Sequence, residues 1–240
     1  HTGITRLDDP HYIAFDPARE AANPPLVLFM AGTGGKPREL AFFPQLLRAG
    51  IRVVSITYNT REAIQQVCPR HPDPDCAAKV RTKRLYGTNT IDVIDDEPTD
   101  AIVPRLVWLL ENLQRNHPSE GWGAYLDNGR VNWSRVIVTG QSQGAGMAAY
   151  IAHEHRVARA VLFSSPWDSY GAPPVLAPWL SRASATPMDR WFGGYHGKEN
   201  TAALLARTYA ALRIPPANIR VWTAEPAALN GPNPYHGVGI

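Results

Sequence analysis

The sequence predicts an α/β fold with a mostly parallel central sheet and helices on both faces. Short, continuous apolar runs recur along the chain, as expected for strands that are buried on both faces of a parallel sheet. These runs alternate with longer segments whose apolar residues repeat at helical spacing. The 240 residues suffice for one such unit, and we expect a single domain over residues 1–240.

The predicted elements follow one another in a regular order. Pro44 falls within the first predicted helix, and Gly50 is expected to end it. The first half of the chain is expected to hold two short strands in 3–16, a strand over 26–30, a helix over 39–48 and a strand over 51–57.

The second half continues the alternation after a long interruption. Two segments, 60–98 and 166–187, show weak periodicity, and we expect them to be excursions that frame the active site. The regular elements are a helix over 100–116, a strand over 135–139 with a helix after 144, a strand over 160–163, a strand over 190–194, a helix over 201–213 and a strand over 218–223.

The segment Gly140-Gln141-Ser142-Gln143-Gly144 lies between a β-branched run and a helix of small residues. This pattern is typical of a nucleophile elbow, a strained turn that presents a serine hydroxyl at the end of a strand. The two glycines remove Cβ atoms that would collide with the adjoining strand and helix. The N–H of Gln143 is then predicted to donate to an oxyanion. An ordinary glycine-rich turn is the alternative.

A nucleophilic serine needs a base, and His236 is the predicted one. It follows the last predicted strand, on a loop that can return to the elbow. His196 is the rival candidate. His153 and His155, far along the helix after the elbow, are expected at the surface.

The histidine in turn needs a carboxylate to fix its tautomer. Glu199 and Asp168 both follow predicted strands, at the sheet edge where ligand sites form. Asp189 precedes a strand and is less well placed. We predict Glu199 as the acid and keep Asp168 as the alternative. For each of the two, an ordinary surface or helix-capping carboxylate is the competing interpretation.

The glycine-rich segment 31–35 follows the first buried strand. Such a loop supplies the second oxyanion donor in hydrolases of this kind, and the N–H of Thr33 is the predicted group. A flexible turn is the competing interpretation. A phosphate-binding loop is not indicated, because no Gly-Lys-Ser/Thr ending is present.

These residues together resemble the α/β-hydrolase superfamily, in its serine esterase, lipase and cutinase-like group. The resemblance spans most of residues 25–240 and is carried by 140–144, 31–35 and the order Ser142, Glu199, His236. It implies the α/β-hydrolase fold, a catalytic triad of these three residues and no cofactor or metal.

The composition argues against two classes of partner, nucleic acid and the membrane interior. The formal net charge of +3 and the absence of a dense basic cluster argue against nucleic acid, and no apolar run is long enough to span a membrane. The basic residues within 79–84 are expected in a solvated loop.

Cys68 and Cys76 bracket a proline-rich loop, and a disulfide between them would favour a secreted or periplasmic protein. Free thiols, or a metal site at non-standard spacing, are the alternatives.

The sequence therefore predicts a serine hydrolase that cleaves carboxylic esters through an acyl-enzyme on Ser142. Thioesterase, acyltransferase and peptidase activities on the same fold stay open, as does a binding protein without activity. Small-molecule and polymeric esters both stay open as substrates, and the sequence does not specify the oligomeric state. Trp167, Trp179 and Trp191 are candidates for the walls of the cleft, with core packing as the alternative.

Overall fold

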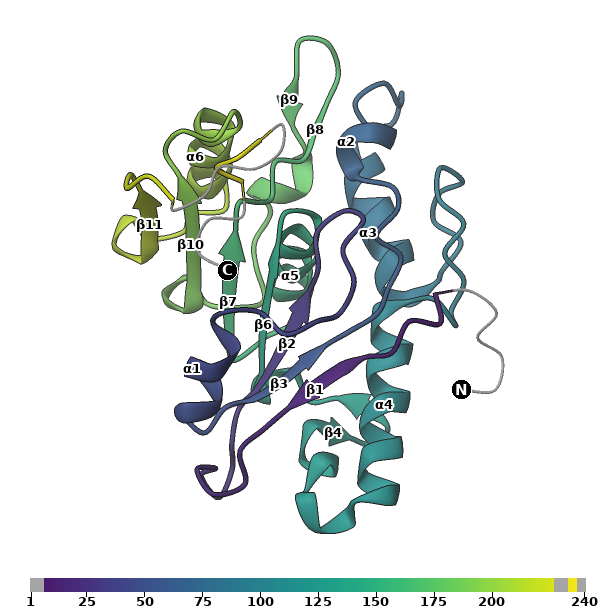
Figure 1. Cartoon of the computed structure of the whole chain (residues 1–240). Coiled ribbons are helices and arrows are strands. Elements are labelled where there is room, and N and C mark those ends of the chain that lie inside the picture. The colour runs from purple at the N-terminus through teal and green to yellow at the C-terminus, as the bar shows by residue number, and fades with distance from the viewer. Residues whose placement is uncertain (1–6, 227–232, 237–240) are drawn as a thin grey trace.

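The computed structural model describes residues 7–226 and 233–236, and its centre is a seven-stranded sheet (Figure 1). The strand order is β1-β3-β2-β6-β7-β10-β11. The strands are β1 (Tyr12–Ala14), β2 (Leu26–Met30), β3 (Arg52–Ser55), β6 (Val136–Gln141), β7 (Arg159–Phe163), β10 (Trp191–His196) and β11 (Ile219–Trp222).

Only the edge strand β1 runs against its neighbour, and the other pairings in this sheet are parallel. The predicted α/β class with a mostly parallel sheet is therefore confirmed. Its register is informative, because Gln141 pairs with Phe163 and Phe163 pairs with Gly194. The segments that follow β6, β7 and β10 thus leave the sheet at one edge, where ligand sites form in parallel sheets.

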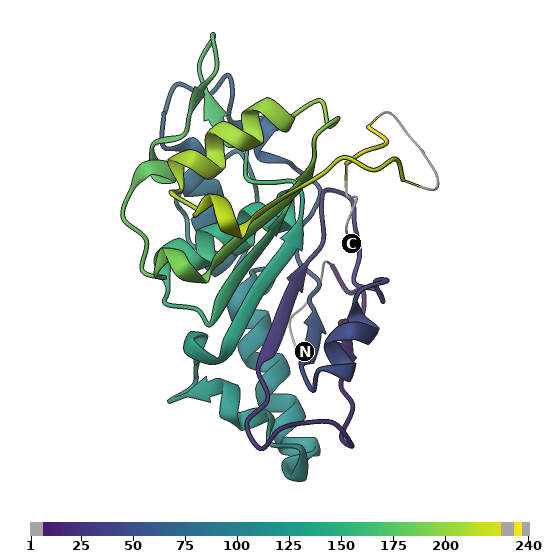
Figure 2. The ribbon, with the colours of Figure 1, turned by 90° about the vertical axis from the view of Figure 1, so that its left-hand side faces the viewer.

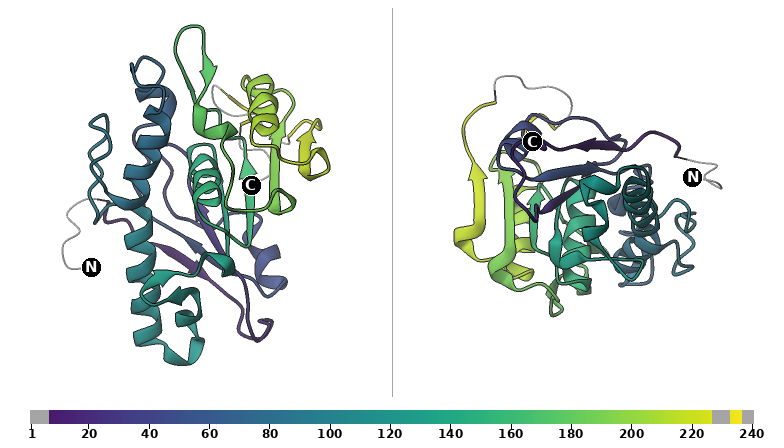
Figure 3. Two further views of the ribbon diagram at one scale, coloured as in Figure 1. Left: turned by 180° about the vertical axis from the view of Figure 1, so that it is seen from behind. Right: turned by 90° about the horizontal axis from the view of Figure 1, so that it is seen from below.

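Helices cover both faces of the sheet (Figure 2). Helix α1 (Phe43–Arg48) packs on one face, where Phe43 and the β2 residues Val27 and Phe29 form a small apolar cluster. The other helices are α2 (Ile64–Val67), α3 (Cys76–Tyr86), α4 (Ile102–Asn116), α5 (Gln143–Glu154) and α6 (Ala202–Ala211). The view from below in Figure 3 shows α3, α4 and α5 together on the opposite face, in agreement with the contacts that α3 makes to both α4 and α5.

The main core lies between the sheet and these helices. Helix α4 contributes Leu106 and Leu110, which are fully buried, and presents its polar side to solvent. Each such leucine stabilises the fold by about 1.5–3 kcal/mol relative to an exposed position. Trp122, Trp179 and Trp191 are the largest buried side chains. For Trp179 and Trp191, the core interpretation is therefore correct and the cleft-wall interpretation is wrong.

Short elements complete the chain. Two small antiparallel hairpins pair β4 (Leu126–Asp127) with β5 (Arg130–Val131) and β8 (Ser169–Tyr170) with β9 (Val175–Leu176). Single 3₁₀ turns span Pro118–Glu120, Trp122–Tyr125, Trp133–Arg135, Pro178–Ser181, Met188–Arg190 and Pro216–Asn218. Helix α1 is shorter than the predicted 39–48 and has Pro44 in its first turn, where a missing N–H is tolerated.

The segment 79–84 is not the solvated loop that we expected. It forms most of helix α3, and its Arg81 and Arg84 side chains are almost fully buried. Arg81 pairs with Asp168 through two short contacts, and Arg84 lies 3.3 Å from Asp96. The prediction failed because this helix buries cations against carboxylates from distant segments, so it carries no ordinary apolar stripe.

Glycine makes room for one of these cations. A Cβ at Gly146, on α5, would lie 2.2 Å from the Arg81 guanidinium. The small residues after the elbow therefore also allow a charged side chain to cross the helix. His153, on the same helix, was expected at the surface but is buried. Its ring packs edge-on against Trp179.

Cys68 and Cys76 form a disulfide, which joins the end of α2 to the first residue of α3. Both thiols are thus occupied, and the metal-site and free-thiol alternatives for this pair are wrong. Within residues 7–226 and 233–236, no helix is both long and apolar enough to cross a membrane.

Candidate active site

Ser142 occupies a strained turn between β6 and α5. Its φ is 54° and its ψ is −124°, a region that residues with a Cβ rarely adopt. The Ser142 N–H donates to the Phe163 carbonyl on the adjacent strand at 2.9 Å, and the Ser142 carbonyl accepts the Gly146 N–H of the first helical turn. The strain is held by these bonds, one to the sheet and one to the helix.

The two glycines of the pentapeptide are required by close backbone contacts. A Cβ at Gly144 would lie 2.0 Å from the Met30 carbonyl oxygen, and a Cβ at Gly140 would lie 2.5 Å from the same atom. Both distances are far below van der Waals contact. The strand β2, the strand β6 and the start of α5 therefore converge at a point that only glycine permits.

The glycine-rich loop after β2 lies directly against the elbow. A Cβ at Gly32 would fall 2.4 Å from Gln141 Oε1 and 3.2 Å from Ser142 Cβ. The following residue, Thr33, has its hydroxyl 3.4 Å from the side-chain amide of Gln143. The structure thus brings together the loop and the helix start whose N–H groups were the predicted oxyanion donors.

Tyr58 supports the glycine-rich loop from the interior of the protein. Its hydroxyl donates a short hydrogen bond to the Ala31 carbonyl, inside the protein. Burial raises the pKa of the Tyr58 phenol, so the hydroxyl stays protonated and keeps its role as a donor. Nothing in the sequence indicated this support, because Tyr58 lies just after the next strand in an unremarkable context.

Glu199 and His236 are hydrogen-bonded at 3.0 Å between Oε2 and Nδ1. The Glu199 side chain is fully buried, whereas 18% of the His236 side chain is exposed. The other Glu199 oxygen accepts from the Ser164 hydroxyl at 2.6 Å and from the His196 N–H at 2.9 Å. The carboxylate is therefore fixed on one side and directed at the imidazole on the other.

These bonds determine the charge of Glu199. Burial acts to raise its pKa, but the hydrogen bonds from His236, Ser164 and the His196 N–H outweigh burial and lower it. Glu199 is thus a buried carboxylate that stays ionised. Such a group favours the imidazole tautomer with its proton on Nδ1, and it stabilises the imidazolium when a proton arrives at the other nitrogen.

The sheet register connects this pair with the serine. Ser142 and Ser164 each follow one residue after the paired positions Gln141 and Phe163. Ser164 bonds Glu199 with its hydroxyl, and its N–H donates to the Gly194 carbonyl on the far side. The elbow and the support of the acid are therefore neighbours at the same edge of the sheet.

Two features decide the fold. The sheet is mostly parallel with one antiparallel edge strand, and a strained serine lies between a central strand and a helix. The chain has the α/β-hydrolase fold. In this fold the loops after the parallel strands carry the reacting groups.

Three solved structures with a related chain path carry esterase names. A phospholipase/carboxylesterase from Dyadobacter fermentans is 12% identical with a TM-score of 0.42, covering 93% of this chain and 91% of its own. A Bacillus cereus carboxylesterase is 16% identical with a TM-score of 0.42, over 89% and 82%. Esterase 2 of Thermogutta terrifontis, phosphorylated by paraoxon, is 15% identical with a TM-score of 0.46, over 95% and 78%.

No known protein family's sequence profile matches the chain, and no curated protein is significantly similar to it in sequence. Similarity at 12–16% identity does not transfer the activities named for those esterases to this chain. Its function has to be argued from its own residues.

His236 is held by its neighbours as well as by Glu199. Its ring stacks on Trp167 at 5.3 Å between centroids, with 27° between the planes. The preceding residue, Tyr235, stacks on His196 at 4.6 Å and donates to Glu225 at 3.0 Å. Of the three tryptophans that we considered for the cleft, Trp167 is thus the one beside the candidate base.

The two alternative residues are engaged elsewhere. His196 is fully buried, with its Nδ1 accepting from the Lys198 N–H and its Nε2 near the Ala224 carbonyl at 3.0 Å, so neither nitrogen is available as a base. Asp168 is also fully buried, and its oxygens accept from Arg81 and from the Trp179 indole N–H. Asp168 therefore has a structural ion pair, whereas Glu199 has the imidazole.

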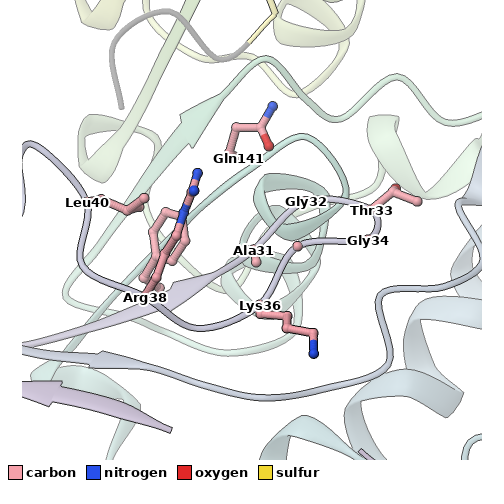
Figure 4. Close-up of a pocket in the computed structure, with 10 residues that line it drawn as sticks. Ala31, Gly32, Thr33, Gly34, Lys36, Arg38, Leu40 and Gln141 are labelled. Carbon is pink, nitrogen blue, oxygen red and sulfur yellow. The ribbon is translucent and has the colours of Figure 1, made fainter. Parts of the chain in front are cut away.

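A cavity of about 370 Å³ lies beside the glycine-rich loop (Figure 4). Its lining includes Gly32 and Thr33 from that loop and Gln141 from the end of β6. Figure 4 shows Arg38 extending toward Gln141, whereas Lys36 points away from it. The candidate site is therefore bordered by an open space large enough for a small substituent of a substrate.

Proposed function

We propose that this chain is a serine hydrolase that cleaves carboxylic esters through an acyl-enzyme on Ser142. The observation that carries the proposal is the hydrogen bond of the buried Glu199 carboxylate to His236, at the same sheet edge as the strained Ser142. A buried ionised carboxylate on one imidazole nitrogen is the arrangement that makes the other nitrogen a base for a serine hydroxyl.

In the proposed reaction, Ser142 Oγ forms a bond to the ester carbonyl carbon while its proton moves to His236. The tetrahedral oxyanion is held by the N–H groups of Thr33 and Gln143, the second of which starts helix α5 and gains from its dipole. Collapse expels the alcohol, which takes the proton from His236. Water then attacks the acyl-enzyme by the same route, and the acid leaves.

A fluorophosphonate probe tests the nucleophile directly. We expect one probe molecule to attach to Ser142, detectable by intact mass and peptide mapping, and no attachment in Ser142→Ala. The exposed Ser181 offers a matched control, and Ser181→Ala should label like the wild type. Labelling that persists in Ser142→Ala, or full esterase activity of that variant, would overturn the proposal.

The bond that is cleaved is decided by a panel of matched acyl donors. We expect 4-nitrophenyl esters of short acids to be hydrolysed with a kcat/KM well above those of the corresponding thioester and anilide. Preference for the thioester or the amide would instead assign a thioesterase or a peptidase. Transfer to an added alcohol or amine in place of water would assign an acyltransferase.

Two wider proposals accompany this function. The Cys68–Cys76 disulfide supports a secreted or periplasmic location, since such bonds persist in oxidising compartments. We also propose that the segments 60–98 and 166–187 frame the active site. The second of these supplies Trp167 beside His236, and the first supplies helix α3, which packs on the elbow helix α5.

A further inference from the structure

The cavity beside the glycine-rich loop has apolar walls and a cationic rim. Phe29 and Leu40 supply the apolar part, and Arg38 and Lys36 supply the charge. No aspartate or glutamate of residues 7–226 or 233–236 is part of the lining. This is the composition of a pocket for a short carbon chain that ends in an anion.

The cavity shares a wall with the candidate nucleophile. Gly32 lines it, and the same residue lies against Ser142, as the 3.2 Å between its added Cβ and Ser142 Cβ shows. Gln141, the residue before the nucleophile, lines it as well. A group seated there would be separated by only a few bonds from a carbonyl carbon at Ser142.

The two cations of the rim are not equivalent. Lys36 Nζ lies 2.9 Å from Asp9, which neutralises its charge, and in Figure 4 its side chain points away from Gln141. Arg38 is exposed, extends toward Gln141 in the same view, and has no ion pair with another residue of the described chain. The net positive charge at the cavity is therefore that of Arg38.

We propose that Arg38 binds a carboxylate of the substrate, so that the preferred substrates are half-esters of short dicarboxylic acids. The inference rests on the proposed function and names its substrate class. A guanidinium can bind a carboxylate through two parallel hydrogen bonds, which a lysine cannot do. Phe29 and Leu40 contact the intervening methylene groups. Attack by Ser142 releases the alcohol, and hydrolysis of the acyl-enzyme releases the dicarboxylate.

The test compares two esters with the same leaving group. One is the mono-4-nitrophenyl ester of glutaric acid, which carries a free carboxylate, and the other is neutral 4-nitrophenyl butyrate. For the wild type we expect a higher kcat/KM with the glutarate ester. Arg38→Gln should lower kcat/KM for the glutarate ester about tenfold or more and change that for butyrate less than twofold.

A matched control and a charge reversal sharpen the result. Arg48→Gln removes an equal, exposed charge on helix α1 outside the cavity, and it should leave the ratio of the two kcat/KM values unchanged. Arg38→Glu should lower the ratio further than Arg38→Gln. Arg38→Lys should recover only part of it, since the ammonium offers no planar pair of donors.

The possible failures are distinguishable. If butyrate is hydrolysed in a Ser142-dependent way but Arg38→Gln leaves the ratio unchanged, the substrate inference is wrong and the proposed function stands. Equal losses on both esters would likewise overturn it, because they would indicate general damage to the site. If Ser142→Ala hydrolyses both esters as fast as the wild type, the proposed function is wrong and the inference falls with it.

Discussion

Glu199 Oε2 and His236 Nδ1 lie 3.0 Å apart, although 37 positions of the chain separate the two residues. The bond spans helix α6 and strand β11, which lie between them in sequence. The carboxylate is buried and accepts hydrogen bonds from the Ser164 hydroxyl and the His196 N–H, so the imidazole is oriented by a group that is itself held in place.

Glu199→Gln should reduce activity much more than stability. The amide keeps the shape of the side chain but loses the negative charge that stabilises the imidazolium, and we expect kcat to fall by about 10³–10⁴-fold. Steady-state kinetics on 4-nitrophenyl butyrate and a thermal unfolding curve measure the two effects. A variant with more than a tenth of the wild-type kcat would show that Glu199 is not the acid of the triad.

Asp168→Asn should reduce stability much more than activity. It breaks the fully buried ion pair with Arg81, and the loss of one partner of such a pair costs about 3–5 kcal/mol of the free energy of unfolding. Chemical denaturation measures this loss, while kcat of the protein that remains folded should stay within a few-fold of the wild type. A selective fall of kcat at unchanged stability would instead give Asp168 the catalytic role.

Tyr58→Phe tests the support of the glycine-rich loop. The substitution removes the hydroxyl that bonds the Ala31 carbonyl and leaves that buried oxygen without its partner, at about 1–3 kcal/mol of stability. Because the loop carries one predicted oxyanion donor, we expect kcat to fall about tenfold with little change in KM. An unchanged kcat would show that the loop is placed without the tyrosine.

Stability should decline in acid through His11. Its Nδ1 accepts the Thr57 N–H at 3.0 Å, and burial, followed by the nearby charge of Arg105, lowers its pKa from 6.5 to about 4. Below pH 6.5 the unfolded chain takes up this proton while the folded protein resists it, so stability falls between pH 6.5 and 4. The loss is at most about 3–4 kcal/mol.

His11→Asn isolates this effect from other titrations. The asparagine side chain carries an acceptor oxygen near the position of Nδ1 and does not titrate in this range. Denaturant unfolding at a series of pH values should therefore give a shallower decline between pH 6.5 and 4 for the variant than for the wild type. Identical slopes for both proteins would contradict the role of His11.

The disulfide should stabilise the start of α3. It closes a loop with a sequence separation of 8. A closed loop of this size lowers the conformational entropy of the unfolded chain, which adds about 2–3 kcal/mol to the free energy of unfolding. The double variant Cys68→Ser with Cys76→Ser should lower the midpoint of thermal unfolding accordingly. A midpoint unaffected by the double substitution, or by a reductant on the wild type, would contradict this role.

The local requirements of the site are visible in the sequence. A strained serine needs glycines two positions away on both sides, and a Cβ at Gly140 or Gly144 would collide with the Met30 carbonyl of β2. Runs such as 26–30 contain only apolar residues because both faces of those strands are buried. Periodicity and close-contact requirements act over a few residues, so one sequence suffices to predict the parallel sheet, the helices α1, α4, α5 and α6, and the elbow.

Partnerships between distant residues were decided by the tertiary structure. Glu199 and Asp168 both follow parallel strands, and the sequence favoured Glu199 without excluding Asp168. In the structure, Asp168 pairs with Arg81 of α3 and Glu199 bonds His236. That helix was itself missed, because its buried side includes the cations Arg81 and Arg84, whose carboxylates come from elsewhere in the chain. The residues next to a charged side chain in the sequence do not show whether that side chain is buried. Burial of a charge depends on ion-pair and hydrogen-bond partners that only the folded chain brings to it.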